Sequence, residues 1–132
     1  MKLRGYIFSR SFLGERVPQH VQNIVIRDYC NKNKYNYLLS ATEYAMPASD
    51  LMLKQTISEF ENIDGVVAYS IFQLPENSNI RFSIIKSFLD AKKELHFACE
   101  GMSIKNNDDH QKIETIWQIK LTVNLCELKG DL

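Results

Sequence analysis

The chain is poor in cysteine, glycine and proline. Its three cysteines, Cys30, Cys99 and Cys126, form no C-x-x-C pair, which argues against a disulfide framework and against a cysteine-based zinc site. We therefore expect reduced thiols, as in a cytoplasmic protein. Five glycines and three prolines in 132 residues leave no low-complexity linker, so we expect a single domain over residues 1–132.

An excess of charge and long apolar runs are also missing. Sixteen basic residues balance sixteen acidic ones, whereas a general nucleic-acid binder needs a basic surface that neutralises phosphates. The segment Met1–Gly5 lacks the apolar run of a signal peptide, and no stretch approaches the roughly 18 apolar residues of a membrane span. We expect no nucleic-acid partner, no membrane partner and a cytoplasmic location.

What the chain does have is a regular alternation of strand and helix patterns. Strands are expected at residues 3–8, 35–41, 66–72 and 95–99, and helices at 18–34, 51–62, 80–89 and 107–125. Four such units predict an α/β fold. We expect a three-layer, doubly wound domain with a mainly parallel, four-stranded sheet in the flavodoxin-like order second, first, third, fourth.

Apolar spacing predicts which face of each helix is buried. The first helix is expected to bury Val17, Val21, Ile24, Val25 and Tyr29, with Arg27, Asp28 and Lys32 opposite. The third carries Ile80, Ile84, Ile85, Phe88 and Leu89, and the last carries Ile113, Ile116, Trp117, Leu121 and Leu125.

In the expected strand order, the chain reverses its direction of winding between the first and third strands. Ligands of doubly wound folds bind in the crevice at that point, beyond the carboxyl ends of the strands. The residues that we place there are Ser9, Arg10 and Ser11 on one side, Phe72, Gln73 and Glu76 on the other, and Glu43 and Glu100 from the flanking strands.

An arginine beside a helix amino terminus suits a phosphate or a carboxylate, because the guanidinium fork and the helix amides act on the same anion. Arg10 and Arg16 fit this description, although a surface pair with Glu15 is the alternative. Ser9 and Ser11 suit hydrogen bonding to a ligand better than nucleophilic attack. A nucleophilic serine needs a base, and only His20 is close in sequence.

Two loop carboxylates, Glu43 and Glu100, are candidates for a general acid and base. Helix capping or simple solvation is the alternative for both. His96 lies within a strand and is expected to be structural, whereas His110 is expected to be solvated. The three histidines show no metal-ligand spacing, so we predict neither a bound metal nor a cofactor.

Three segments within about the first hundred residues are similar to one known domain: Leu3-Arg4-Gly5-Tyr6, Asp64-Gly65-Val66-Val67 with Phe72-Gln73-Leu74-Pro75, and Glu100-Gly101-Met102-Ser103. They resemble the catalytic domain of serine recombinases of the resolvase type, which implies a resolvase-like fold. The active-site pattern departs from that family. Phe8 occupies the position of the first catalytic arginine and Arg10 that of the nucleophilic serine, while Gln73 and Glu76 occupy positions of further arginines. We therefore expect the fold without the recombination chemistry.

A second resemblance covers nearly the whole chain. It rests on the segments Arg4-Gly5-Tyr6-Ile7-Phe8-Ser9-Arg10, Arg16-Val17-Pro18-Gln19-His20-Val21-Gln22-Asn23, Leu38-Leu39-Ser40-Ala41-Thr42-Glu43-Tyr44-Ala45-Met46 and Tyr69-Ser70-Ile71-Phe72-Gln73-Leu74-Pro75. These segments resemble the sporadic carbohydrate cluster proteins, a small bacterial family whose genes lie among those for surface polysaccharide synthesis. The resemblance implies a setting and no mechanism.

Two hypotheses follow. In the first, the chain binds or acts on a sugar phosphate or a nucleotide sugar: Ser9, Arg10 and Ser11 hold the phosphate, Gln19, His20 and Gln73 hold sugar hydroxyls, and Glu43 or Glu100 transfers a proton. In the second, the domain is a non-catalytic homo-oligomeric scaffold or regulator, with the last helix around Trp117 as its partner surface.

Overall fold

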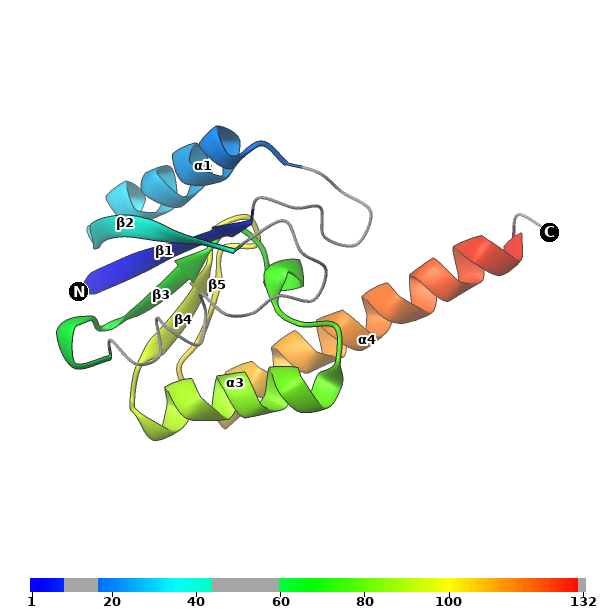
Figure 1. Ribbon diagram of the computed structural model, residues 1–132. Helices are drawn as coiled ribbons and strands as arrows, with labels where there is room; N and C mark the ends of the chain where they lie inside the picture. The colour runs from blue at the N-terminus through cyan, green and yellow to red at the C-terminus, as the bar shows by residue number, and fades with distance from the viewer. Residues whose placement is uncertain (9–16, 44–59, 131–132) are drawn as a thin grey trace.

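The computed structural model describes residues 1–8, 17–43 and 60–130, with side chains described for 1–7, 17–38 and 61–123 (Figure 1). The strands are β1 Lys2–Phe8, β2 Asn36–Glu43, β3 Gly65–Ala68, β4 Glu94–Phe97 and β5 Met102–Ile104. The α-helices are α1 Gln19–Lys32, α3 Ser78–Asp90 and α4 Asn107–Gly130. Two short 3₁₀ helices are η1 Phe60–Asn62 and η2 Ile71–Gln73.

All five strands join one sheet in the order β2-β1-β3-β4-β5. β1 pairs in parallel with β2 and β3, and β3 pairs in parallel with β4. This arrangement confirms the α/β class and the expected order of the first four strands. The sequence analysis missed β5, which pairs antiparallel with β4, because three residues are too few to show a strand pattern.

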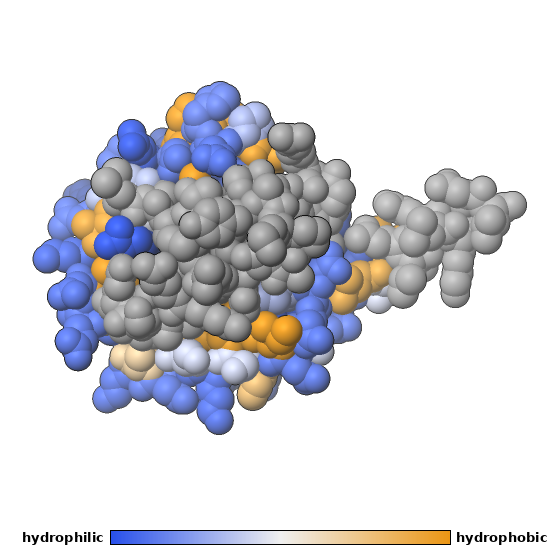
Figure 2. Space-filling model, viewed as in Figure 1, coloured by the Kyte–Doolittle hydropathy of each residue, from blue (hydrophilic) through white to orange (hydrophobic). Residues whose placement is uncertain are grey.

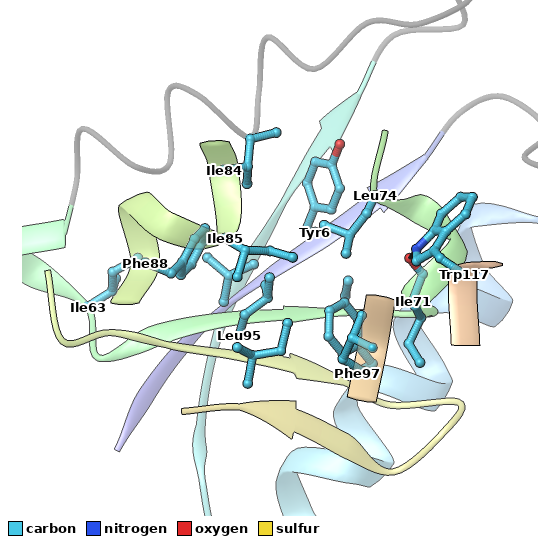
Figure 3. Close-up of a cluster of buried hydrophobic side chains, with 14 residues drawn as sticks. Tyr6, Ile63, Ile71, Leu74, Ile84, Ile85, Phe88, Leu95, Phe97 and Trp117 are labelled. Atoms are coloured by element: carbon cyan, nitrogen blue, oxygen red, sulfur yellow. Dashed lines mark hydrogen bonds between the residues drawn. The ribbon is translucent and has the colours of Figure 1, made fainter. Parts of the chain in front are cut away.

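Helices cover both faces of the sheet, α1 on one side and α3 with the first half of α4 on the other (Figure 1). Strand side chains alternate between these faces. Val67 packs with Leu3, Ile7, Ile26 and Cys30 beneath α1. Its neighbours Val66 and Ala68 belong to the larger cluster on the opposite face, which also holds Tyr6, Phe88, Phe97 and Trp117 (Figure 3).

Two glycines meet geometric demands of the sheet. A Cβ atom on Gly65 would lie 2.2 Å from the carbonyl oxygen of Glu94, so β3 and β4 approach this closely only because the side chain is absent. Gly101 has a φ of 64° in the turn between β4 and β5. That left-handed conformation favours glycine.

Several element details differ from the sequence analysis. The third strand ends at Ala68 and the chain turns into η2, where we had expected strand to residue 72. α1 buries Gln22, Ile26 and Cys30. Of its predicted face, Val17 and Tyr29 pack against the core, but Ile24 is 63% exposed, so the buried side is rotated from the prediction. Ile80 of α3 is also exposed, at 44%. Most of the helix expected at 51–62 lies outside the described residues.

Within the described part of the chain, no helix is both long enough and apolar enough to cross a membrane.

Candidate functional site

The carboxyl edge of the sheet carries a carboxylate that ties two strand ends together. Glu100 follows β4, and its Oε2 accepts a hydrogen bond of 2.9 Å from the Ser70 hydroxyl, just beyond β3. Its Oε1 accepts from the backbone N–H of Ile71, also at 2.9 Å. Glu100, a candidate acid or base, therefore also fixes the start of η2.

Gln73 fixes the other end of the same turn. Its side-chain oxygen accepts from the backbone N–H of Tyr69 at 2.9 Å, and with Ser70 it forms a capping box around η2. The Ser-x-x-Gln spacing of this motif can be seen in the sequence. Gln73 is 1% exposed, so this predicted sugar-binding residue is packed inside the protein.

The network continues into α1. Gln73 Nε2 donates to the side-chain oxygen of Gln22 at 2.7 Å, and Gln22 Nε2 donates to the backbone carbonyl of Val17 at 2.8 Å. Gln22 is fully buried, which explains why a polar residue lies on the inner face of this helix: its amide is paired. Hydrogen bonds thus run from the end of β4 to the segment just before α1.

The start of α1 is more open. Pro18 is its N-cap residue, no side chain among the described residues caps the helix, and no acidic residue lies in its first turn. Gln19 and His20 are both exposed there. This end of the helix therefore keeps its positive electrostatic character.

The remaining predicted site residues are only partly covered by the described structure. Glu43 is the last residue of β2 and pairs with Phe8 of β1, so its backbone lies at the carboxyl edge of the sheet. The candidates Ser9, Arg10, Ser11 and Arg16 lie outside the described residues. Among the residues that are described, no group of three His, Cys, Asp or Glu side chains is placed to hold a metal ion.

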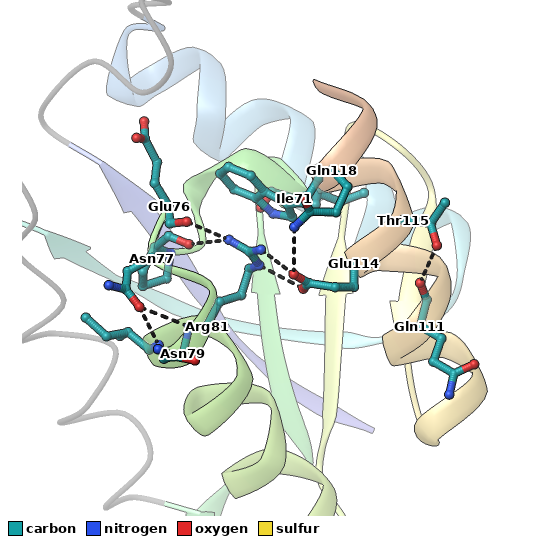
Figure 4. Close-up of polar contacts among 12 residues, drawn as sticks. Ile71, Glu76, Asn77, Asn79, Arg81, Gln111, Glu114, Thr115 and Gln118 are labelled. Atoms are coloured by element: carbon teal, nitrogen blue, oxygen red, sulfur yellow. Dashed lines mark hydrogen bonds and ion pairs between the residues drawn. The ribbon is translucent and has the colours of Figure 1, made fainter. Parts of the chain in front are cut away.

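An ion pair between buried Arg81 and partly exposed Glu114, which was not expected from the sequence, joins α3 to α4 (Figure 4). Arg81 is fully buried, and its Nε and Nη2 donate to the two carboxylate oxygens of Glu114 at 3.0 and 2.5 Å. This fork holds the pKa of Glu114 below its usual value. Arg81 shares its helical spacing with the buried residues Ile84, Ile85 and Phe88. That spacing was the only sign in the sequence that Arg81 would be buried.

The same arginine also holds the loop that follows η2. Arg81 Nη1 donates to the carbonyl oxygens of Pro75 and Glu76 at 2.9 and 3.0 Å. The guanidinium carbon lies 4.5 Å from the centre of the Trp117 ring, and Trp117 Nε1 donates to the carbonyl of Ile71 at 3.2 Å. These contacts of Trp117 hold the inner side of α4 against the end of the sheet.

A second buried cluster lies beneath α1. Tyr29 Oη is 2.6 Å from His96 Nδ1, and His96 Nε2 is 2.8 Å from a carboxylate oxygen of Glu94. Because a carboxylate accepts, neutral His96 carries its proton on Nε2, and Nδ1 accepts from the tyrosine hydroxyl. Burial lowers the pKa of His96 below 6.5 and raises that of Tyr29 to about 12. His96 is structural, as expected.

His110 differs from the expectation. It is 9% exposed, and its ring centre lies 5.4 Å from that of Phe82 on α3. The expectation that it is solvated was wrong, because the long α4 begins against α3.

The opposite side of α4 is open. We call the exposed residues on this side, Gln111, Thr115, Gln118, Ile119, Thr122 and Val123, the outer face of α4. Together with Glu114 they line a shallow, mostly open groove on the surface. Ile119 is 59% and Val123 44% exposed. Hydrophobic atoms appear on α4 where it leaves the body of the molecule (Figure 2).

Comparison with solved structures identifies the architecture. The N-terminal catalytic domain of TP901-1 integrase matches with a TM-score of 0.66 at 16% identity, over 98% of this chain and 99% of that chain. The fold is resolvase-like. A resolvase family site-specific recombinase from Streptococcus pneumoniae matches with the same TM-score at 10% identity, over 97% of this chain and 95% of that chain. No protein-family model matches the chain, and no curated protein matches it significantly.

Proposed function

We propose that this resolvase-like domain is a non-catalytic, self-associating module that serves as a scaffold or regulator in bacterial surface carbohydrate synthesis, in the cytoplasm. The observation that carries the proposal is the outer face of α4, which the described residues leave exposed. The carbohydrate setting comes from the resemblance of the strand-end segments to the sporadic carbohydrate cluster proteins.

The geometry of α4 supports a partner surface. Ile113 and Trp117 on its inner side are fully buried, and in Figure 1 the second half of the helix extends away from the sheet and α3. Ile119 and Val123 lie four residues apart on this side of the helix, and both are exposed. Covering them would remove apolar surface from water, which favours association.

The chemistry of the outer face favours a second copy of the chain as the partner. Gln111 and Gln118 stand seven residues apart, as do Thr115 and Thr122, and a seven-residue repeat keeps side chains on one seam between two helices. The hydroxyls of Thr115 and Thr122 donate to the carbonyls of Gln111 and Gln118 in their own helix, which leaves the hydroxyl oxygens as acceptors, while glutamine amides offer both donors and acceptors. Such a seam is complementary to itself across a two-fold axis.

Details of the sheet edge support a function without recombination chemistry. In serine recombinases, which the sequence resembles, an arginine is expected at the position of Gln73. The Gln73 side-chain oxygen accepts a backbone hydrogen bond, and an arginine has no acceptor atom. The side chain at position 73 therefore stabilises the turn η2, a role that an arginine could not fill in the same way.

Sedimentation velocity over a range of protein concentrations tests the proposal. We expect concentration-dependent dimers of the wild type and monomers of Ile119→Asp. Ile24→Asp is the matched control, because Ile24 is an equally exposed isoleucine on a different helix, and it should associate like the wild type. A wild type that stays monomeric at every concentration would overturn the proposal.

A second candidate function is binding of a sugar phosphate or nucleotide sugar at the start of α1. The uncapped helix terminus with exposed Gln19 and His20 favours it. A thermal-shift screen against these ligands, repeated with Arg10→Ala and His20→Ala, tests it, with the exposed Arg27→Ala as control. A ligand at a hundredfold excess over its dissociation constant stabilises by about 2.7 kcal/mol. No shift across the panel would remove this candidate.

A further inference from the structure

Glu114 carries a negative charge that would oppose the pairing of two outer faces. Among the described residues that line the groove, Glu114 alone is charged, and its side chain is 30% exposed. A two-fold axis along this seam would bring two Glu114 carboxylates into one interface. Like charges that meet across an interface cost several kcal/mol.

We infer that Arg81 is the residue that permits this self-association, because it neutralises Glu114 from inside the domain; this inference rests on the proposed function. Arg81 binds both carboxylate oxygens and is fully buried. A partner therefore meets a carboxylate whose charge is already compensated, and no cation is needed from the second copy.

The other groups around Glu114 leave this role to Arg81. Gln118 Nε2 lies 3.4 Å from Glu114 Oε1 and is neutral. His110, also on α4, packs against Phe82 of α3, with 5.4 Å between the two ring centres. Arg81 is thus a positioning residue: it contacts no partner and acts through Glu114.

A comparison of three variants separates this electrostatic role from a merely structural one. Arg81→Met leaves Glu114 without its cation, and we expect self-association to weaken about tenfold or more at neutral pH. Added salt should restore part of the loss, because it screens the exposed carboxylates. The double variant Arg81→Met/Glu114→Gln removes both charges and should associate nearly like the wild type.

A pair of surface variants keeps the test valid if Arg81→Met does not fold. Thr115 is exposed on the same face, so Thr115→Glu adds a carboxylate that Arg81 does not neutralise, whereas Thr115→Gln adds similar bulk without charge. We expect the glutamate variant alone to weaken association, with the same recovery at high salt.

The outcomes are distinguishable by sedimentation velocity, with circular dichroism as the check of folding. A wild type that never associates overturns the proposed function and this inference together. Association of the wild type that Thr115→Glu leaves unchanged overturns the inference alone. So does an Arg81→Met variant that folds and associates like the wild type. Equal weakening in Arg81→Met and in the double variant also contradicts it, because the effect would then be structural.

Discussion

The carboxyl edge of the sheet and the outer face of α4 differ in how far their polar side chains are exposed. At the edge, Ser70, Gln73 and Glu100 bond to the chain itself. Along α4, Gln111 and Gln118 face solvent beside exposed Ile119. In an α/β domain the edge is the usual place for a ligand. Here its described polar groups hold the turn η2 in place, and the open surface lies on a helix.

Removal of Arg81 is expected to give the largest effect, because the inner side of α4 depends on it. Arg81→Ala leaves the Glu114 carboxylate without its partner and frees the carbonyls of Pro75 and Glu76. Hydrogen bonds to charged groups contribute about 1.5–3 kcal/mol each, and because Glu114 is 30% exposed, water can solvate part of its freed carboxylate. Chemical denaturation measures the loss. The control Arg27→Ala, at an exposed arginine, should cost less than about 1 kcal/mol. An equal loss of stability in both variants would show that the Arg81 hydrogen bonds do not stabilise the packing of α4.

Replacing Glu100 tests whether its carboxylate holds the turn η2 in place. Glu100→Ala removes the acceptor of the Ser70 hydroxyl and of the Ile71 N–H, and each unsatisfied buried group costs about 1–3 kcal/mol. Glu100→Gln keeps an acceptor and should lose less. Exposed Glu76 offers the control Glu76→Ala. If Glu100→Ala unfolds at the same denaturant concentration as the wild type, its carboxylate does not hold the turn.

Mild acid should weaken the cluster beneath α1. Burial lowers the folded-state pKa of His96 below 6.5, so the unfolded chain binds more protons in that range. Stability should therefore be complete above about pH 6.5 and fall as the pH decreases toward the folded-state pKa. Protonation of Glu114, whose pKa is lowered from 4.5, follows only at still lower pH.

Denaturation at a series of pH values measures this dependence. His96→Gln should flatten the curve between about pH 6.5 and pH 5. Exposed His20→Gln should keep the wild-type shape. A wild-type stability that rises on acidification through this range would contradict the arrangement of Tyr29, His96 and Glu94.

The smallest change in stability is expected on the outer face of α4. Gln118→Ala and Thr122→Ala lie at exposed positions, where substitutions usually change stability by about 0.5 kcal/mol or less. Both should nevertheless weaken self-association. Denaturation of the dilute monomer, compared with sedimentation of concentrated protein, separates the two effects. A large loss of monomer stability would show that this face is part of the folded core.

The parts of the fold that the sequence predicts are those with a long, regular pattern. Residues 3–8 and 95–99 show strand patterns, and Ile84, Ile85 and Phe88 show a helical one, so strand order and helix placement could be predicted. β5 is too short to leave a pattern. Buried Gln22 and Arg81 are polar residues on core faces, and only their partners, which are distant in sequence, account for them.

The candidate site was harder to predict than the fold. The structure places Gln73 and Glu100 beside the end of β3, but the sequence does not show whether a polar group bonds to a ligand or to the protein. The Ser70–Gln73 capping box was the available clue. The exposed position of Ile119 agrees with the helical spacing of Ile113 and Trp117, which are buried on the other side of α4, but that spacing does not show whether a partner covers it.

Amide chemical shifts recorded across a dilution series test the central claim most directly. Self-association through α4 predicts concentration-dependent shifts at residues 111–123, with little change at the sheet edge around Tyr69, Gln73 and Glu100. Shifts that gather at the sheet edge instead, or none over the whole range of concentration, would contradict the assignment of function to the outer face of α4.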